Sequence, residues 1–158
     1  MNHIDMMKLA LNEAGKAKQK DEVPIGAVVV SAAGDILSKA HNQAIFLSDP
    51  TAHAEILALR SAAKRVMNYR LLNTTLYVTV EPCIMCMGAI VHARIGKVVF
   101  GTDDPKGGAA GSLYNFASDT RLNHQPKVIS GICRDECKTL IQNFFRVKRA
   151  SCRKGITY

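Results

Sequence analysis

Two short segments constrain the fold of this chain more than any other feature, because their side chains form a useful site only where they meet in space. They are His53-Ala54-Glu55 and Pro82-Cys83-Ile84-Met85-Cys86, and together they offer one imidazole, two thiols and one carboxylate. Three protein ligands with a fourth position left open are typical of catalytic zinc, whereas structural zinc is enclosed by four. The pattern therefore predicts a catalytic zinc site with His53, Cys83 and Cys86 as ligands. Glu55 is expected beside the metal but not bound to it.

The two cysteines are predicted to share one face at the start of a helix. Pro82 suits the first turn of a helix, and the apolar run that follows has little turn chemistry. Residues three apart lie side by side, and the positive end of the helix dipole favours thiolates, the form that binds metal. His53 and Glu55 would point about 200° apart within a helix. We therefore expect Thr51 to cap a helix over 52–64, whose first-turn side chains can converge beyond its end.

The predicted ligand set indicates which chemistry the site needs. Two thiolates cancel the charge of the dication, so the metal is a weaker Lewis acid than one held by three histidines. A nearby base must help, and Glu55 can pass a proton from a metal-bound water to a ring nitrogen and then to a leaving amine. This shuttle suits the hydrolytic deamination of an aromatic base.

The signature H-x-E followed by P-C-x-x-C resembles that of the cytidine-deaminase-like zinc deaminases, and this likeness supports the assigned roles beyond what spacing alone shows. Within that superfamily the chain is most similar to the bacterial tRNA-specific adenosine deaminases. The likeness runs from about residue 22 to residue 149. It is carried by the segments Glu22-Val-Pro-Ile-Gly-Ala, Asp49-Pro-Thr-Ala-His-Ala-Glu, Asn68-Tyr-Arg-Leu, Leu76-Tyr-Val-Thr-Val-Glu-Pro-Cys, Gly107-Gly-Ala-Ala-Gly-Ser-Leu, Leu122-Asn-His and Phe144-Phe-Arg.

The resemblance implies an α/β fold of three layers, α/β/α, with a central five-stranded mixed sheet. It implies one zinc ion per subunit, a homodimer, and the conversion of adenosine to inosine at the wobble position of a tRNA anticodon loop, with release of ammonia. It places Asn42 against the target base and ribose, and Asp104 against the 2′-hydroxyl of a flanking nucleotide. It also places the backbone N–H groups of Ala54 and Cys83 near the base and the attacking oxygen.

Two positions depart from the family pattern. Met87 follows the second cysteine where alanine is common, and Gln43 follows Asn42 where arginine is common. The first change is expected to alter packing beneath the cavity and the second to weaken a phosphate contact. Neither touches the zinc chemistry.

Other interpretations of the cysteine pair remain open. A lone C-x-x-C also occurs in structural zinc sites and redox dithiols. A four-cysteine site would recruit Cys133 and Cys137 and would leave His53 and Glu55 unexplained. Two functional alternatives also stand: a deaminase of the same superfamily that acts on free guanine, cytosine or a nucleoside, and a non-catalytic, zinc-stabilised RNA-binding module. We expect no metal role for the remaining cysteines and histidines, which are Cys133, Cys137, Cys152, His3, His41, His92 and His124.

Length and composition set broader limits. A chain of 158 residues predicts one domain, spanning 1–158. Nothing in it resembles a signal peptide or a membrane span, and five cysteines, an odd number, fit a reducing compartment, so we expect a cytoplasmic protein. The formal charge of +8 attracts polyanions and makes nucleic acid a sensible partner.

Part of that charge gathers in a basic C-terminal helix and tail over about 135–158. Five cations follow Phe144 and Phe145 there: Arg146, Lys148, Arg149, Arg153 and Lys154. Phosphate neutralisation together with base stacking is how proteins hold unpaired RNA, so Phe145 and Arg146 are candidate RNA contacts. The alternative, which the residues alone favour, is a solvated helix end whose two phenylalanines face the core, and it is the family resemblance that favours the RNA contacts.

Hydrophobic periodicity predicts alternating helices and strands. We expect helices over 3–19, 52–64, 83–94 and 135–149, and strands over 25–30, 36–40, 76–80, 97–101 and 128–131. Such an alternation favours a sheet covered by helices on both faces, with the two metal-binding segments at one end of it.

Overall fold

The computed structural model describes residues 2–153 as a five-stranded sheet between two layers of helices. The elements, in chain order, are α1 (His3–Gln19), β1 (Gly26–Val30), β2 (Ile36–His41), α2 (Ala54–Val66), β3 (Thr75–Val80), α3 (Ile84–His92), β4 (Lys97–Thr102), β5 (Lys127–Ser130) and α4 (Arg134–Arg153). The strand order is β2-β1-β3-β4-β5. Strand β1 runs antiparallel to both of its neighbours, whereas β3, β4 and β5 are parallel. The predicted mixed sheet is confirmed.

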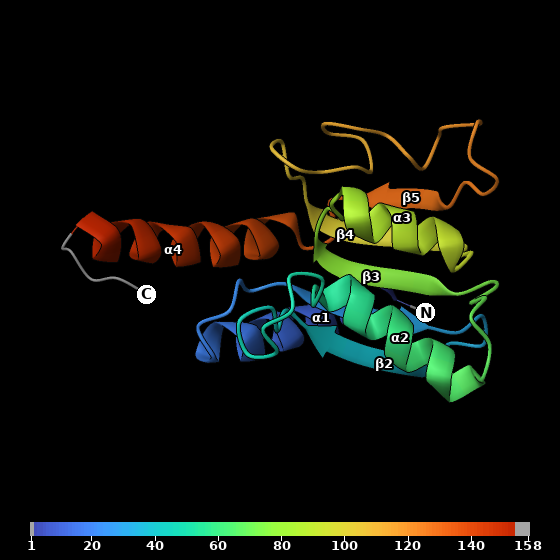
Figure 1. Ribbon diagram of the computed structural model, residues 1–158, viewed down its shortest axis with the longest axis horizontal. Helices are drawn as coiled ribbons and strands as arrows, with labels where there is room; N and C mark the ends of the chain where they lie inside the picture. The colour runs from blue at the N-terminus through green and yellow to red at the C-terminus, as the bar shows by residue number, and fades with distance from the viewer. Residues whose placement is uncertain (1, 154–158) are drawn as a thin grey trace.

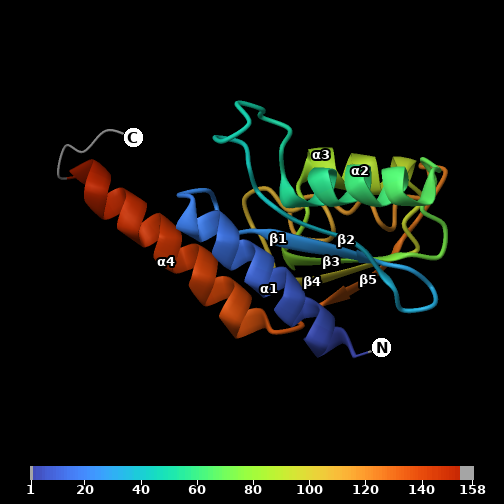
Figure 2. The same ribbon diagram turned by 90° about the horizontal axis from the view of Figure 1, so that it is seen from below.

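Helices cover both faces of the sheet. Helices α2 and α3 lie on one face, and α1 and α4 lie on the other, where α4 extends beyond the end of the sheet (Figures 1 and 2). The central strands are buried on both sides, since successive side chains of β1 enter different cores. Ala27 and Val29 pack with α2 and α3, whereas Val28 and Val30 pack with α1 and Cys137 of α4.

Most predicted boundaries agree with the structure. Helix α1 has the bounds that its apolar spacing predicts, and each strand agrees to about one residue. Helix α4 continues to Arg153 rather than ending near Arg149, because its amphipathic pattern persists; Lys154 of the predicted basic tail lies outside the described residues. None of the helices within 2–153 is long and apolar enough to cross a membrane.

The predicted site residues lie at one end of the sheet, where several strands finish. Strands β2, β3 and β4 all finish there, and β1 begins there, since Gly26 pairs with His41 and its N–H donates to Thr79 Oγ1 at 3.2 Å. In sheets with parallel strands, ligands bind outside the carboxyl ends of the strands. The predicted metal-binding segments follow β2 and β3 and therefore meet at this end of the sheet.

Candidate active site

His53 lies just before α2 rather than inside it. It is the N-cap of the helix, with an extended backbone (φ −74°, ψ 152°), so Glu55 in the first turn faces the same region. The prediction that Thr51 caps this helix is wrong. Asp49 Oδ1 accepts hydrogen bonds from both the backbone N–H and the hydroxyl of Thr51, at 2.8 and 2.7 Å, and this local turn delays the helix to Ala54.

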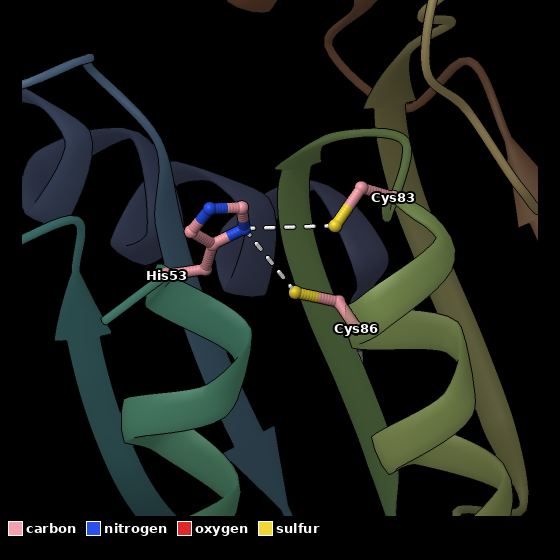
Figure 3. Close-up of side chains that lie close together, drawn as sticks. All are labelled: His53, Cys83 and Cys86. Atoms are coloured by element: carbon pink, nitrogen blue, oxygen red, sulfur yellow. Dashed lines mark hydrogen bonds between the residues drawn. The ribbon is translucent and has the colours of Figure 1, made fainter. Parts of the chain in front are cut away.

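Cys83 takes the same position at the start of α3. It is the N-cap, again with an extended backbone, and Cys86 lies within the first turn. Both sulfurs face the imidazole of His53 (Figure 3). The distances from His53 Nδ1 are 3.6 Å to Cys83 Sγ and 3.5 Å to Cys86 Sγ, and the three atoms lie within 4.8 Å of one another.

This spacing fits a tetrahedral zinc ion. Zinc–nitrogen bonds of about 2.0–2.1 Å and zinc–sulfur bonds of about 2.3 Å, at a tetrahedral angle, separate the two ligand atoms by about 3.5 Å. His53, Cys83 and Cys86 form the one group of three such side chains within residues 2–153 that can hold a metal ion. Glu55 is outside it. The site therefore offers three ligands, the number that leaves a position for another molecule.

Proton affinities within the group reflect how closely the ligands are packed. Hydrogen bonds from Cys86 and His53 lower the pKa of the Cys83 thiol to about 4. The same contact with Cys83, together with burial, raises the pKa of Cys86, and the hydrogen bond to Cys83 raises the pKa of His53. Without a cation the cluster thus keeps protons between its members. A divalent ion held by His53, Cys83 and Cys86 would replace these protons and allow both sulfurs to be thiolates.

The environment of Glu55 differs from that of the three ligands. Its side chain is buried, and its Oε2 is the one buried carboxylate oxygen within residues 2–153 without a hydrogen-bond partner. Burial is the main cause that raises the pKa of this carboxyl from 4.5 to about 7, with a further contribution from the nearby Cys83 thiolate. A carboxyl that titrates near neutral pH can both take up and release a proton, as a general acid–base must.

A cavity of about 1170 Å³ opens over this group. His53, Glu55 and Cys83 line its floor, and residues of the β4–β5 connection and of α4 line its sides. It exceeds the roughly 300–1000 Å³ of ordinary small-molecule pockets. There is space for more than one planar base.

The predicted substrate contacts divide into two sets. Asp104, Cys83, Phe145 and Arg146 line the cavity. Asn42 and Ala54 are not among its lining residues: both are buried, and Asn42 Oδ1 accepts the backbone N–H of Ala54 at 2.7 Å. Asn42 therefore fixes the start of α2, and the Ala54 N–H that the resemblance placed near the base is used within the protein.

Helix α4 gives its two neighbouring phenylalanines different environments. Phe144 is buried and Lys148 lies over its ring at 5.5 Å, whereas Phe145 is 41 % exposed and lines the cavity. The alternative in which both rings face the core thus holds for Phe144 alone. Five cationic side chains also line the cavity, namely Lys106, Arg134, Lys138, Arg146 and Arg149. Arg134 is partly neutralised by Asp103 at 3.2 Å.

Comparison with known proteins now places the chain in a family. The family model of the MafB19-like deaminases matches residues 1–149. The chain belongs to the MafB19-like deaminase family. A tRNA-specific adenosine deaminase of Haemophilus influenzae is 51 % identical over 144 residues, which cover 91 % of this chain and 83 % of that protein. A tRNA-specific adenosine deaminase of Bacillus subtilis is 47 % identical over 96 % of this chain and 95 % of its own length.

Solved structures agree with this assignment. A structure from work on A-to-I editing by tRNA:A34 deaminases at the wobble position of transfer RNA superposes with a TM-score of 0.83, at 44 % identity, over 86 % of this chain and 98 % of that one. A guanine deaminase of Nitrosomonas europaea superposes with a TM-score of 0.78 at 22 % identity, over 89 % and 83 % of the two chains. The second likeness shows a shared fold alone.

The four-cysteine alternative does not apply to this deaminase. Cys137 is buried in the core between the sheet and the α1–α4 layer, on the other side of the sheet from α3. Cys133 packs against that same core. The two cysteines of the C-x-x-C pair lie beside His53 instead. Neither a redox dithiol nor a four-cysteine zinc site would account for His53 at this position.

Sequence reasoning missed two buried carboxylates that shape the deaminase site. Glu22 Oε1 accepts the N–H groups of Ile45 and Phe46, both at 2.8 Å, and holds the loop that leads to His53. Glu81, between β3 and Pro82, holds the loop that carries Asp104. In the sequence, each of these glutamates is visible only as a charged residue next to an apolar strand. That position does not show which backbone groups the carboxylate contacts.

Proposed function

We propose that this deaminase hydrolyses adenosine to inosine at the wobble position of tRNA and releases ammonia. The observation that carries the proposal is a group of three side chains able to hold a metal ion, His53, Cys83 and Cys86, beside the buried carboxylate of Glu55, one oxygen of which has no protein partner; His53, Cys83 and Glu55 line the cavity. Relatives at 45–51 % identity over at least 90 % of this chain carry the name tRNA-specific adenosine deaminase, and that supports adenosine in tRNA as the substrate.

One zinc ion per subunit is the metal that this ligand set suits best, since thiolates and an imidazole at tetrahedral spacing are typical zinc ligands. When bound by His53, Cys83 and Cys86, zinc supplies the Lewis acid that activates water for attack on the carbon carrying the amino group. Metal analysis of purified protein tests this directly. One equivalent of zinc is expected, and the double variant Cys83→Ala, Cys86→Ala should contain none.

Glu55 is proposed as the group that moves protons. Glu55 lines the cavity and its Oε2 has no hydrogen-bond partner, and a pKa of about 7 lets it accept a proton from water and deliver protons to the ring nitrogen and the leaving amine. Asn42 is proposed to orient the region beside the base through its bond to Ala54. The backbone N–H of Cys83 is proposed to lie near the attacking oxygen.

The walls of the cavity favour RNA over a free base. Phe145 offers a stacking surface, and Arg146 with its cationic neighbours offers phosphate contacts. Asp104 is proposed to accept a hydrogen bond from a ribose 2′-hydroxyl. A wobble base is already poorly stacked in its loop, so turning it into the cavity costs less than extruding a base from a duplex.

A free-base deaminase remains the closest competitor, because a guanine deaminase of Bacillus subtilis is 38 % identical with a TM-score of 0.62 over 65 % of this chain. The test is to incubate the protein with total tRNA and, separately, with free adenosine, guanine and cytosine, and to measure inosine and ammonia. We expect product from tRNA alone, with a rate that falls steeply as salt rises, because RNA contacts release counterions. Turnover of a free base with little salt dependence would overturn the proposal.

The proposal also includes a homodimer working in the cytoplasm, where tRNA is used. Light scattering on the purified protein tests the first part, with a mass of twice 17.2 kDa expected. The non-catalytic RNA-binding alternative is tested by Glu55→Ala. Retained zinc and tRNA binding with loss of inosine supports catalysis, whereas unchanged inosine formation would exclude Glu55 as the proton carrier.

A further inference from the structure

The carboxylate of Glu81 lies at the junction between the metal-binding segment 82–86 and the loop 104–112, part of which lines a side of the cavity. Glu81 follows the last residue of β3 and immediately precedes Pro82-Cys83. Its side chain is a lining residue of the cavity but is only 3 % exposed. A charge in such a position is costly unless hydrogen bonds replace its hydration.

The hydrogen bonds come from a single loop. Glu81 Oε1 accepts the backbone N–H of Asp104 at 3.1 Å and the hydroxyl of Ser112. Glu81 Oε2 accepts the backbone N–H groups of Ala110 and Ser112, both at 3.0 Å. Both oxygens are therefore used by the segment 104–112, and hydrogen bonds to an ionised acceptor are about twice as strong as those between neutral groups.

The loop also passes very close to this carboxylate. A Cβ atom added at Gly108 would lie 2.3 Å from Glu81 Cδ and 2.4 Å from Oε2, so only glycine fits there. Gly108 forms an isolated β-bridge with Cys83, and the N–H of Ala109 donates to Pro82 O at 2.9 Å. The metal-binding segment and the loop are thus joined by one charged and several backbone contacts.

This arrangement fixes the floor of the cavity relative to one of its sides. The floor carries Cys83, a ligand of the proposed zinc, and the side carries Asp104 and Lys106. The amide of a glutamine would turn an NH₂ group toward backbone N–H donors, so it cannot replace the carboxylate. Loss of the charge would release the loop while leaving His53, Cys83 and Cys86 in place.

We propose that Glu81 is a positioning residue that holds the loop 104–112 against the metal-binding segment and thereby sets the affinity of this deaminase for tRNA. The inference rests on the proposed function. It assigns to Glu81 no contact with the reacting atoms, and it predicts a defect in substrate binding rather than in metal binding or in the chemical step.

The test compares wild type, Glu81→Gln and a matched control, Asp119→Asn. Asp119 also holds a loop, through the N–H and guanidinium of Arg121, but it does not line the cavity. For E81Q we expect KM for tRNA to rise at least about tenfold, which corresponds to the loss of one charge-assisted hydrogen bond, with kcat within about threefold of wild type. Zinc content should be unchanged, and amide hydrogen exchange of Ala110 and Ser112 should become faster. D119N should change none of these values.

Two further variants approach the same contact from the loop. Gly108→Ala forces the backbone away from Glu81 and should reproduce the effect of E81Q on KM and exchange. Ser112→Ala removes only the hydroxyl donor, so a smaller change in the same direction is expected, and it provides the test if E81Q does not fold. Unchanged KM and unchanged exchange in both E81Q and G108A would overturn the inference.

The outcomes separate this inference from the function on which it rests. If the wild type forms no inosine in tRNA, the proposed function fails, and the exchange data still decide whether Glu81 holds the loop. If the wild type is active and E81Q instead loses zinc, or loses kcat with an unchanged KM, Glu81 acts on the metal site or the chemistry and the positioning role is wrong.

Discussion

Replacing Glu55 with glutamine tests two consequences of burying this carboxyl. One is its capacity to transfer protons in catalysis, and the other is the cost in stability of burying its charge. The substitution keeps the shape of the side chain but removes its ability to exchange a proton. General acid–base catalysis contributes about 10²–10⁴ in rate, or about 3–5 kcal/mol. We therefore expect E55Q to lower kcat for inosine formation at least about 10²-fold, with one zinc still bound.

The same substitution should make the metal-free protein more stable at alkaline pH. Burial raises the pKa of Glu55 from 4.5 to about 7, so the folded state holds this proton more tightly than the unfolded chain does. The penalty for the charged form is absent below pH 4.5 and is complete above pH 7. At 1.36 kcal/mol for each tenfold change in proton affinity, it amounts to about 3 kcal/mol at pH 8.

Urea unfolding of chelator-treated protein measures this difference. E55Q should exceed wild type by up to about 3 kcal/mol at pH 8 and by little at pH 4. The matched control is Glu13→Gln, a buried carboxyl of α1, which lies on the face of the sheet opposite α2 and α3. Burial raises the pKa of Glu13, but hydrogen bonds from Lys16 and His41 outweigh it and lower the pKa overall. E13Q should therefore be less stable than wild type, with the opposite dependence on pH.

Two results would refute this reasoning. If E55Q kept more than about a tenth of wild-type kcat, far less than general acid–base catalysis contributes, Glu55 would not be the proton carrier. If its stability relative to wild type were the same at pH 4 and pH 8, the carboxyl would not be held in the folded protein with a raised pKa.

Further predictions concern the metal, the cationic wall and the core. His53→Ala should abolish zinc binding and inosine formation while leaving the far-ultraviolet circular dichroism of the helices unchanged, because His53 lies outside α2 as its N-cap. Arg146→Ala should raise KM for tRNA and reduce the slope of log KM against log salt by about 0.7–0.9 if one phosphate contact is lost, with kinetics at four salt concentrations as the measurement. The pKa of Glu13 is lowered in the folded state, so its contribution to stability is present above pH 4.5 and is lost as the pH falls through the folded-state pKa. In urea unfolding, the difference in unfolding free energy between wild type and E13Q should therefore be smaller at pH 3 than at pH 7. Met7→Ala, at a fully buried position between α1 and the sheet, should cost about 2–5 kcal/mol in unfolding free energy without changing KM.

Sequence patterns predicted the elements of this fold because both the periodicity and the turn chemistry are local. Apolar spacing sets α1, and the β-branched runs set β1 and β4. The start of α2 is different, since the Thr51 cap that the sequence predicts is not used. The Asp49–Thr51 turn satisfies the local N–H groups, and the helix begins only where Asn42, from the preceding loop, accepts the N–H of Ala54. That bond joins residues whose relation depends on the folded loop.

The metal group could be predicted from the sequence because its chemistry restricts the residue types. A histidine and two cysteines spaced at a helix start have few other uses together, so the motif alone indicated the group that the structure brings within 4.8 Å. The carboxylates of Glu22 and Glu81, which hold loops in place, do not need partners of a particular residue type. Glu81 bonds backbone N–H groups 23 to 31 residues away, and a backbone N–H is present at nearly every position of any sequence.

Three glutamates buried near this end of the sheet illustrate what decides the role of a buried carboxylate. Glu22 and Glu81 accept hydrogen bonds from several backbone N–H donors, which tie each carboxylate to a loop. Glu55 has an oxygen without a hydrogen-bond partner, and burial raises the pKa of its carboxyl. A carboxylate saturated by N–H groups has little left to offer a substrate, whereas an unsaturated one exchanges protons readily. The difference lies in the loops around each side chain rather than in the residue itself, so it becomes visible only once the loops are in place.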